Sequence, residues 1–212
     1  SALPSSLPSL SPTNIPTFNP TTAPTAHPTS LPTVYPSFVP TEHLSDKYLL
    51  LKLYDETGGG THWCTSSNWL VGEPCTQSWY GVSCGSRSED TALVATSVVL
   101  SSNCMTGSLP SQLGWFTSLE RLDLSNNEIS NRIPSQMGRL TVLTEIDLTS
   151  NSIWGTLPTE WGGMIALEAG FGLGSNKISG TISTEIGKLV NMEVDFRLDS
   201  NLLSGILPSE VG

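Results

Sequence analysis

The sequence predicts a solenoid of parallel coils, in which one structural unit is repeated along residues 93–212. Five asparagines recur at intervals of 24, 24, 25 and 25 residues: Asn103, Asn127, Asn151, Asn176 and Asn201. A leucine stands three positions before each asparagine, and a further apolar residue stands two positions before that leucine. A fixed period of this length indicates coils that bury their apolar faces only against one another. We therefore expect recognition through an extended surface rather than catalysis in a pocket.

Each unit is expected to begin with a short strand that has one buried face. Leu122 and Leu124 alternate with Asp123, which is the period of a strand. The asparagine that follows can satisfy backbone groups inside a turn, so that stacked coils form a ladder of side-chain amides. A glycine and an aliphatic-proline pair then begin the returning side of most coils, where proline prevents further strand pairing.

Three departures from the repeat carry structural expectations. Asn131 replaces the glycine of the second unit and Ser183 replaces the proline of the fourth. The fourth unit also carries one extra residue and three glycines around its strand, which predicts a small bulge there. The chain ends at Gly212 within its fifth unit without a polar terminal cap, so we expect it to be part of a longer protein.

The units LERLDLSNNEISNRIPSQMGRLTV and LTEIDLTSNSIWGTLPTEWGGMIA resemble the plant-type, extracellular leucine-rich repeat, whose pattern is LxxLxLxxNxLxGxIPxxLGxL. The resemblance covers about five units. It implies a right-handed α/β-type horseshoe with short parallel strands on the concave side. The convex side is then expected to be mostly irregular or 3-10 helical.

Residues 43–92 are expected to form a cap in front of the coils. His43 to Thr57 is predicted as one helix, because Leu44, Tyr48, Leu51 and Tyr54 fall at helical spacing and three glycines end the segment. The segments NWL at 68–70, PC at 74–75 and WYGVSC at 79–84 resemble the N-terminal cap of plant-type repeat proteins. The order TGG, Trp63, NWL and WYGVSC within residues 57–84 most resembles leucine-rich repeat proteins of diatoms and related algae.

Four cysteines allow three disulfide pairings. The resemblance implies a bridge between Cys75 and Cys84, and with it a second bridge between Cys64 and Cys104 that ties the cap to the first coil. A metal site built from His62, Cys64 and a second cysteine pair is the alternative, which the absence of CxxC spacing disfavours. An even number of cysteines favours an oxidising, secreted setting.

Residues 1–42 are predicted to be an extended stalk. Proline occupies every fourth position from Pro4 to Pro40, and serine or threonine follows it each time. Such a composition does not bury enough surface to fold, and a polyproline-like stalk would reach up to about 120 Å at ~3.1 Å per residue. The regular hydroxyls favour dense O-glycosylation, with an unmodified flexible linker as the alternative.

Composition and motifs exclude several classes of function. The net charge of −10 disfavours nucleic-acid binding, and no apolar run is long enough to span a membrane. No catalytic serine–histidine–aspartate set, HExxH motif or phosphate-binding loop occurs, so we expect neither an enzyme nor a cofactor. No N-glycosylation acceptor is present either.

The candidate ligand surface consists mainly of strand positions that point away from the core. Its charged members are Arg121, Asp123, Glu145, Asp147, Asp195, Arg197 and Asp199. Asp123 and Asp147 are expected on neighbouring strands, where their like charges oppose each other unless Arg121 offsets them. Trp115 and Trp154 complete the candidates, because each occupies a position that is usually polar in the repeat.

These features favour a secreted, cell-surface or wall-associated recognition module that binds a protein, a peptide or a polysaccharide. Within the same class, the chain would be a fragment of a receptor-like kinase ectodomain. In a different class, it would be a structural wall or matrix protein, or an ice-binding protein that uses a column of hydroxyls. The members of that column are Ser111, Ser135, Thr159, Thr184 and Ser209.

The stalk should be dispensable for folding, because it lacks a periodic apolar face. Deleting residues 1–42 should leave the melting temperature nearly unchanged in a thermal unfolding experiment. Removing the cap, residues 43–92, should instead expose the first strand and cause aggregation. A melting temperature several degrees lower without the stalk would show that the tail packs on the repeats, contrary to its interpretation as a spacer.

Overall fold

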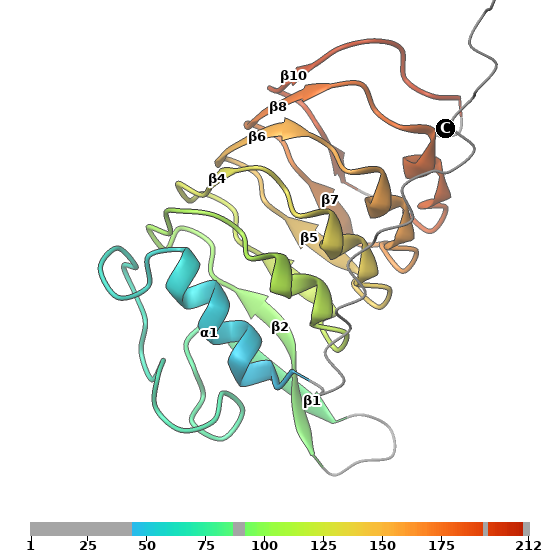
Figure 1. The fold of residues 1–212 in the computed structure, drawn as a ribbon. Helices are drawn as coiled ribbons and strands as arrows, with labels where there is room; N and C mark the ends of the chain where they lie inside the picture. Colours follow the sequence, from blue (N-terminus) through green and yellow to red (C-terminus); the bar gives the residue numbers. More distant parts are fainter. Residues whose placement is uncertain (1–43, 87–91, 193–194, 210–212) are drawn as a thin grey trace, which may run out of the picture. The chain divides into compact units, whose positions relative to one another are not determined.

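The computed structural model describes residues 44–86, 92–192 and 195–209. In it the cap and the stacked coils follow one another in sequence order (Figure 1). These residues belong to one compact unit that spans Pro40–Gly212. The predicted stalk and His43 lie outside the described residues. Parallel strands on one side and 3-10 helices on another confirm the predicted solenoid.

The helix of the cap, α1 (Asp46–Glu56), begins later than the predicted helix. Ser45 explains this start, because its side-chain oxygen accepts a hydrogen bond from the Tyr48 amide at 3.3 Å. The prediction that Tyr48 lies on the buried face of this helix was wrong, since its side chain is 39% exposed. The helix carries leucines on several of its faces, so its apolar pattern alone does not define one buried face. Contacts with the rest of the cap decide which face is buried. Its members are Leu49, Leu50, Leu53 and Tyr54.

Aromatic rings form the core of the cap beside α1. Tyr54, Trp63, Trp69 and Trp79 make a chain of contacts with centroids 4.7–5.6 Å apart. All four are buried, and each indole nitrogen donates to a backbone carbonyl at 2.8–3.0 Å. The tryptophan motifs of the sequence therefore supply apolar area without leaving a buried donor unpaired.

A six-stranded sheet runs along one side of the stack. Its strands, in spatial order, are β1 (Val82–Ser86), β2 (Leu93–Val99), β3 (Arg121–Asp123), β5 (Glu145–Asp147), β7 (Gly170–Gly172) and β9 (Phe196–Arg197). β1 and β2 are antiparallel and all other pairs are parallel. The predicted apolar positions pair directly across the strands, as Leu122 does with Ile146 and Ile146 with Phe171. The extra residue of the fourth unit lies before β7, because β5 and β7 pair in register.

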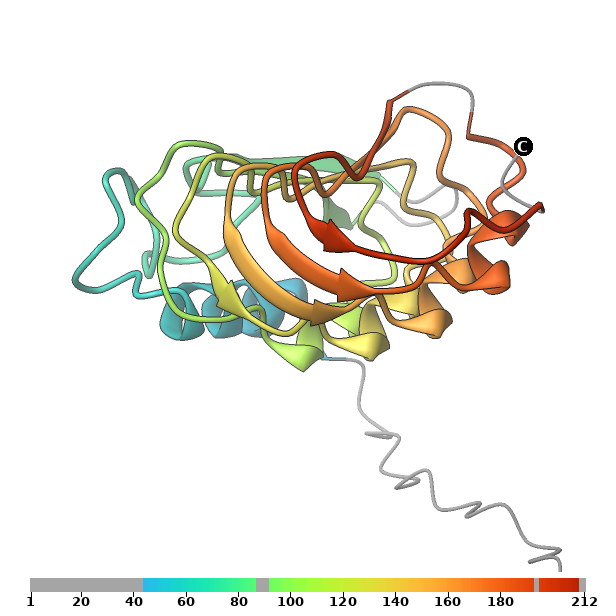
Figure 2. The same cartoon turned by 90° about the horizontal axis from the view of Figure 1, so that it is seen from above.

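Each coil has two further sides (Figure 2). A second, four-stranded sheet contains β4 (Ser130–Asn131), β6 (Ser152–Thr156), β8 (Lys177–Gly180) and β10 (Leu202–Leu203). No pattern in the sequence had indicated this sheet. The returning sides are the 3-10 helices η1 (Ser111–Trp115), η2 (Ser135–Arg139), η3 (Thr159–Gly163) and η4 (Thr184–Lys188). The prolines of the repeat stand immediately before the first three of these helices.

The repeated asparagines connect each coil to the one before it. The Asn127 side-chain oxygen accepts from the amides of Asn103 and Met105, both at 2.9 Å. Its side-chain nitrogen donates to the carbonyls of Leu100 and Leu124, both at 3.0 Å. Leu100 belongs to the preceding coil, so that one amide satisfies backbone groups of two coils. Asn151, Asn176 and Asn201 reach back in the same way.

The cap takes the place of a preceding coil for Asn103. This side chain accepts from the Thr65 amide at 2.7 Å and donates to the Thr65 carbonyl at 2.9 Å. The adjacent disulfide joins Cys64 to Cys104, and the second disulfide joins Cys75 to Cys84 within the cap. All four cysteines are therefore paired, and one bridge holds the cap at the start of the ladder.

Removing one amide of the ladder should destabilise the fold. Asn127→Ala should lower the free energy of unfolding by about 1–3 kcal/mol, because it leaves buried backbone groups of two coils unpaired. Denaturant unfolding followed by circular dichroism measures this change.

Asn126→Ser is the matched control, because the other coils have serine at this position with the same positive φ. It should change stability by less than about 0.5 kcal/mol. Equal losses in the two variants would contradict the role assigned to the ladder.

Candidate functional site

The charged side chains of the candidate ligand surface lie on the outer face of the six-stranded sheet, here called the strand face. Parallel pairing places Arg121 beside Glu145 and Asp123 beside Asp147 on β3 and β5. Asp195 lies just before β9 and Arg197 lies within it, two coils after β5. The inward residues between them are buried, as Leu122 and Ile146 are at 0% exposure. One face of these strands is therefore free for charged groups.

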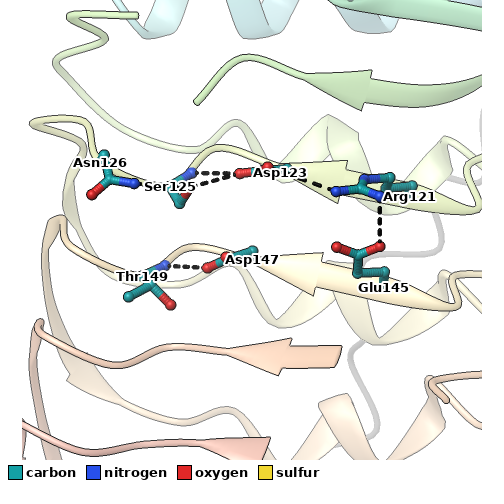
Figure 3. Close-up of polar contacts among 7 residues, drawn as sticks. All are labelled: Arg121, Asp123, Ser125, Asn126, Glu145, Asp147 and Thr149. Atoms are coloured by element: carbon teal, nitrogen blue, oxygen red, sulfur yellow. Dashed lines mark hydrogen bonds and ion pairs between the residues drawn. The ribbon is translucent and has the colours of Figure 1, made fainter. Parts of the chain in front are cut away.

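Arg121 links the first two of these strands (Figure 3). Its guanidinium lies 3.0 Å from a Glu145 carboxylate oxygen and 3.9 Å from one of Asp123. The arginine side chain is 46% exposed, so this exposed pair adds little to stability and mainly fixes the positions of the side chains.

The two aspartates that face each other also close turns at the ends of their strands. An Asp123 oxygen accepts from the Ser125 amide at 3.0 Å and from its hydroxyl at 2.8 Å. An Asp147 oxygen accepts from the Thr149 amide at 2.8 Å in the same way (Figure 3). Such bonds to the backbone two residues further on are typical of an aspartate that begins a turn. They hold both carboxylates despite the like charges, while Arg121 neutralises only the Asp123 side.

The fourth coil leaves a gap in this row of side chains, because glycine occupies the outward positions 170, 172 and 174. A side chain at Gly172 would meet the Asp147 carboxylate and the Thr149 hydroxyl, and one at Gly174 would meet Asp199. Acidic side chains from both neighbouring coils therefore lean over the glycines. A hollow of about 100 Å³ lies there. Its polar lining consists of Glu145, Asp147, Asp195 and Arg197.

Arg197 is the cation of this hollow. Its guanidinium donates to an Asp195 carboxylate oxygen at 3.0 Å. That hydrogen bond and the charge of Asp195 raise the pKa of Arg197 above its usual value, with smaller contributions from Asp147 and Asp199. One arginine thus stands near three carboxylates, those of Asp195, Asp147 and Asp199, so the surroundings keep an excess of negative charge.

The two candidate tryptophans lie away from the strand face. Trp115 belongs to η1 and is half-buried beneath the Arg139 guanidinium, which lies 4.5 Å from its ring centroid. Trp154 belongs to β6 of the second sheet and is 43% exposed. The nine candidate residues thus do not form a single surface.

Sequence reasoning missed a hollow of about 560 Å³ between the cap and the first coil. Its apolar lining includes Leu44, Pro74, Leu93, Val94 and Trp115. Trp115 in a usually polar position was the available signal, but the facing residues come from the cap, about 40 to 70 residues earlier.

Residues 44–86, 92–192 and 195–209 contain no group of histidine, cysteine, aspartate and glutamate side chains arranged to hold a metal ion. The helices of the same ranges include none that is long and apolar enough to cross a bilayer.

Comparison with known proteins identifies the repeats. Residues 118–140 and 142–164 match the family described as Leucine Rich Repeat. No curated protein sequence is significantly similar to this chain.

Solved structures of plant proteins share the fold. The ectodomain of the receptor kinase SOBIR1 from Arabidopsis thaliana is 27% identical, with a TM-score of 0.66 over 79% of this chain and 85% of that chain. A chain of the BIR3–SERK2 complex from the same plant is 30% identical, with a TM-score of 0.62 over 77% of this chain and 85% of that one. A plant ice-binding protein shares the fold at 24% identity and a TM-score of 0.66, over 79% of this chain and 51% of its own length. The chain belongs to the leucine-rich repeat proteins, and its solenoid has the architecture of the plant receptor ectodomains.

Proposed function

We propose that this chain is an extracellular recognition module that binds a basic protein or peptide segment through the strand face. The observation that carries this proposal is the gathering of Glu145, Asp147 and Asp195 around the glycine-lined hollow, with Asp199 close by over Gly174. Arg121 and Arg197 are the cations of this face, and each is already paired with carboxylates. The excess of negative charge favours a partner that brings lysine or arginine side chains.

The comparisons support this class of function. One similar chain comes from a complex of BIR3 with SERK2, and SOBIR1 is a receptor kinase whose ectodomain has this fold. Pairing of all four cysteines in disulfides supports an extracellular location, because such bonds persist in oxidising compartments. The proposed role is binding rather than catalysis.

A second candidate is the outer, ligand-binding part of a membrane receptor. The likeness to the SOBIR1 ectodomain over 85% of its length favours it. The sequence of the full-length gene is the test, since a membrane-spanning segment and a kinase after Gly212 would support this candidate. The ice-binding alternative has weaker support, because the hydroxyls at Ser111 and Thr159 begin 3-10 helices rather than lie on a flat sheet.

The stalk and the wording of the cap belong to the same proposal. We infer that residues 1–42 form an O-glycosylated spacer that holds the module away from a cell surface or wall, because a serine or threonine follows each of the regularly spaced prolines there. The motifs of residues 57–84 support an origin among diatom or algal relatives. Mass spectrometry of the secreted protein would detect glycans on residues 1–42.

The strand face should select basic peptides. The probe is an array of synthetic decapeptides. Each peptide is present in two versions, one that contains lysines and one in which glutamines replace those lysines. The wild-type chain should bind the lysine versions. Asp147→Asn combined with Asp199→Asn should weaken this binding at least about ten-fold, because charge-assisted contacts are lost. The turn at Asp147 should survive this change, because the oxygen of an asparagine side chain can still accept from the Thr149 amide.

Glu128→Gln combined with Glu160→Gln is the matched control, because it removes the same charge from exposed positions outside the strand face. It should change binding less than about two-fold, as expected for screened distant charges. Equal losses in the two double variants, or no preference for lysine peptides, would contradict the proposal.

A further inference from the structure

Three outward side chains form a row across the second sheet, here called the lateral row: Arg132, Trp154 and Lys177. Asn131 pairs with Ile153, which places the next residue, Arg132, beside Trp154. Trp154 in turn pairs directly with Lys177 of β8. The three side chains therefore come from consecutive coils, with neighbouring strands about 4.8 Å apart.

The lateral row faces away from the core. Trp154 is 43% exposed, and Arg132 and Lys177 are exposed as well. The residues that alternate with them, Ile153 and Ile178, are 1% exposed and point inward. The Arg132 guanidinium lies 5.2 Å from the Trp154 ring centroid, which holds the indole in place while leaving much of it accessible.

The chain has a net charge of −10, and the lateral row brings together two of the four described cations that form no ion pair with a carboxylate; the other two are Lys52 and Arg139. Arg121, Arg197, Lys47 and Lys188 each form an ion pair with a carboxylate. Across the described part of the chain, no carboxylate forms an ion pair with Arg132 or Lys177. Lys177 donates a hydrogen bond to the Ser152 hydroxyl at 3.4 Å. Two neighbouring positive charges on either side of an exposed indole are thus available to a ligand.

Hydroxyls rather than other aromatics surround the row. Ser130 and Ser179 occupy the Trp154 position in their own coils, and each hydroxyl donates to a glycine carbonyl of the preceding coil. Their oxygens remain able to accept a hydrogen bond. Thr156, two residues after Trp154 on β6, is also exposed. The surface therefore offers one flat apolar ring, two cations and several hydroxyl acceptors.

We propose that the lateral row binds an anionic polysaccharide whose sugar residues carry carboxylates, a polyuronate. The indole would stack on the C–H face of one sugar ring, and Arg132 and Lys177 would bind carboxylates of that ring and its neighbour. A guanidinium matches a carboxylate in a two-pronged hydrogen bond. An acidic peptide fits less well. β6 is already paired to β4 and β8, so a peptide strand has no free edge to join there. This site is separate from the strand face, on a different sheet.

Surface plasmon resonance on immobilised polygalacturonate, without divalent cations, tests the proposal with the full chain. The wild type should bind. Arg132→Gln combined with Lys177→Gln should weaken binding at least about ten-fold, and Trp154→Ser, which restores the serine of neighbouring coils, by a similar factor. Thermal unfolding of each variant should match the wild type. Asp147→Asn with Asp199→Asn should leave this binding intact, which separates it from the strand-face proposal.

Lys52→Gln combined with Arg139→Gln is the control, because it removes the same charge from two cations that also lie over aromatic rings, Tyr48 and Trp115. Binding should change less than about two-fold. An equal loss in this control would overturn the site, as would the absence of wild-type binding. Equally tight binding of polyglutamate would assign the row to acidic chains in general, and equally tight binding of neutral dextran would remove the carboxylate from the recognition; either result would overturn the polyuronate proposal.

Discussion

Hydrogen bonding of the backbone between successive coils is the constraint on which the rest of this structure depends. The strands are two to seven residues long, so that much of each coil is irregular backbone with polar groups that need partners. One asparagine in each coil meets this need, because its amide both accepts and donates across the boundary between coils. The cap offers Thr65 to Asn103 in the same manner, so it functions as the start of the ladder.

Close approach of the returning sides adds a second requirement. A side chain at Gly138 would collide with the Glu160 carbonyl of the next 3-10 helix, and Gly114 and Gly162 meet the same restriction. Glycine at this position allows the coils to stack at the distance that the ladder and the strands demand. The leucines, asparagines and glycines of the repeat are therefore occupied by the stack itself, and other positions are free to vary.

Those free positions lie on separate sides of each coil, which gives the molecule two surfaces of different chemistry. The strand face carries carboxylates, two of which also close turns. The second sheet carries the lateral row, where two cations lack carboxylate partners among the described residues. Surfaces of opposite charge on one scaffold favour partners of different kinds.

The sequence by itself determined the period, the paired strand positions and the asparagine spacing, because each follows from apolar and amide residues at fixed separations. Through its family resemblance it also indicated the pairing of Cys64 with Cys104 and Cys75 with Cys84. Only the tertiary structure decided which leucines of α1 are buried and that β4, β6, β8 and β10 form a second sheet. Strands of two to five residues held by backbone pairing leave no apolar alternation to detect. The tertiary structure also placed Trp115 and Trp154 on different sides of their coils and formed the hollow beside Gly172. Both features depend on contacts between neighbouring coils, which the sequence of a single coil does not specify.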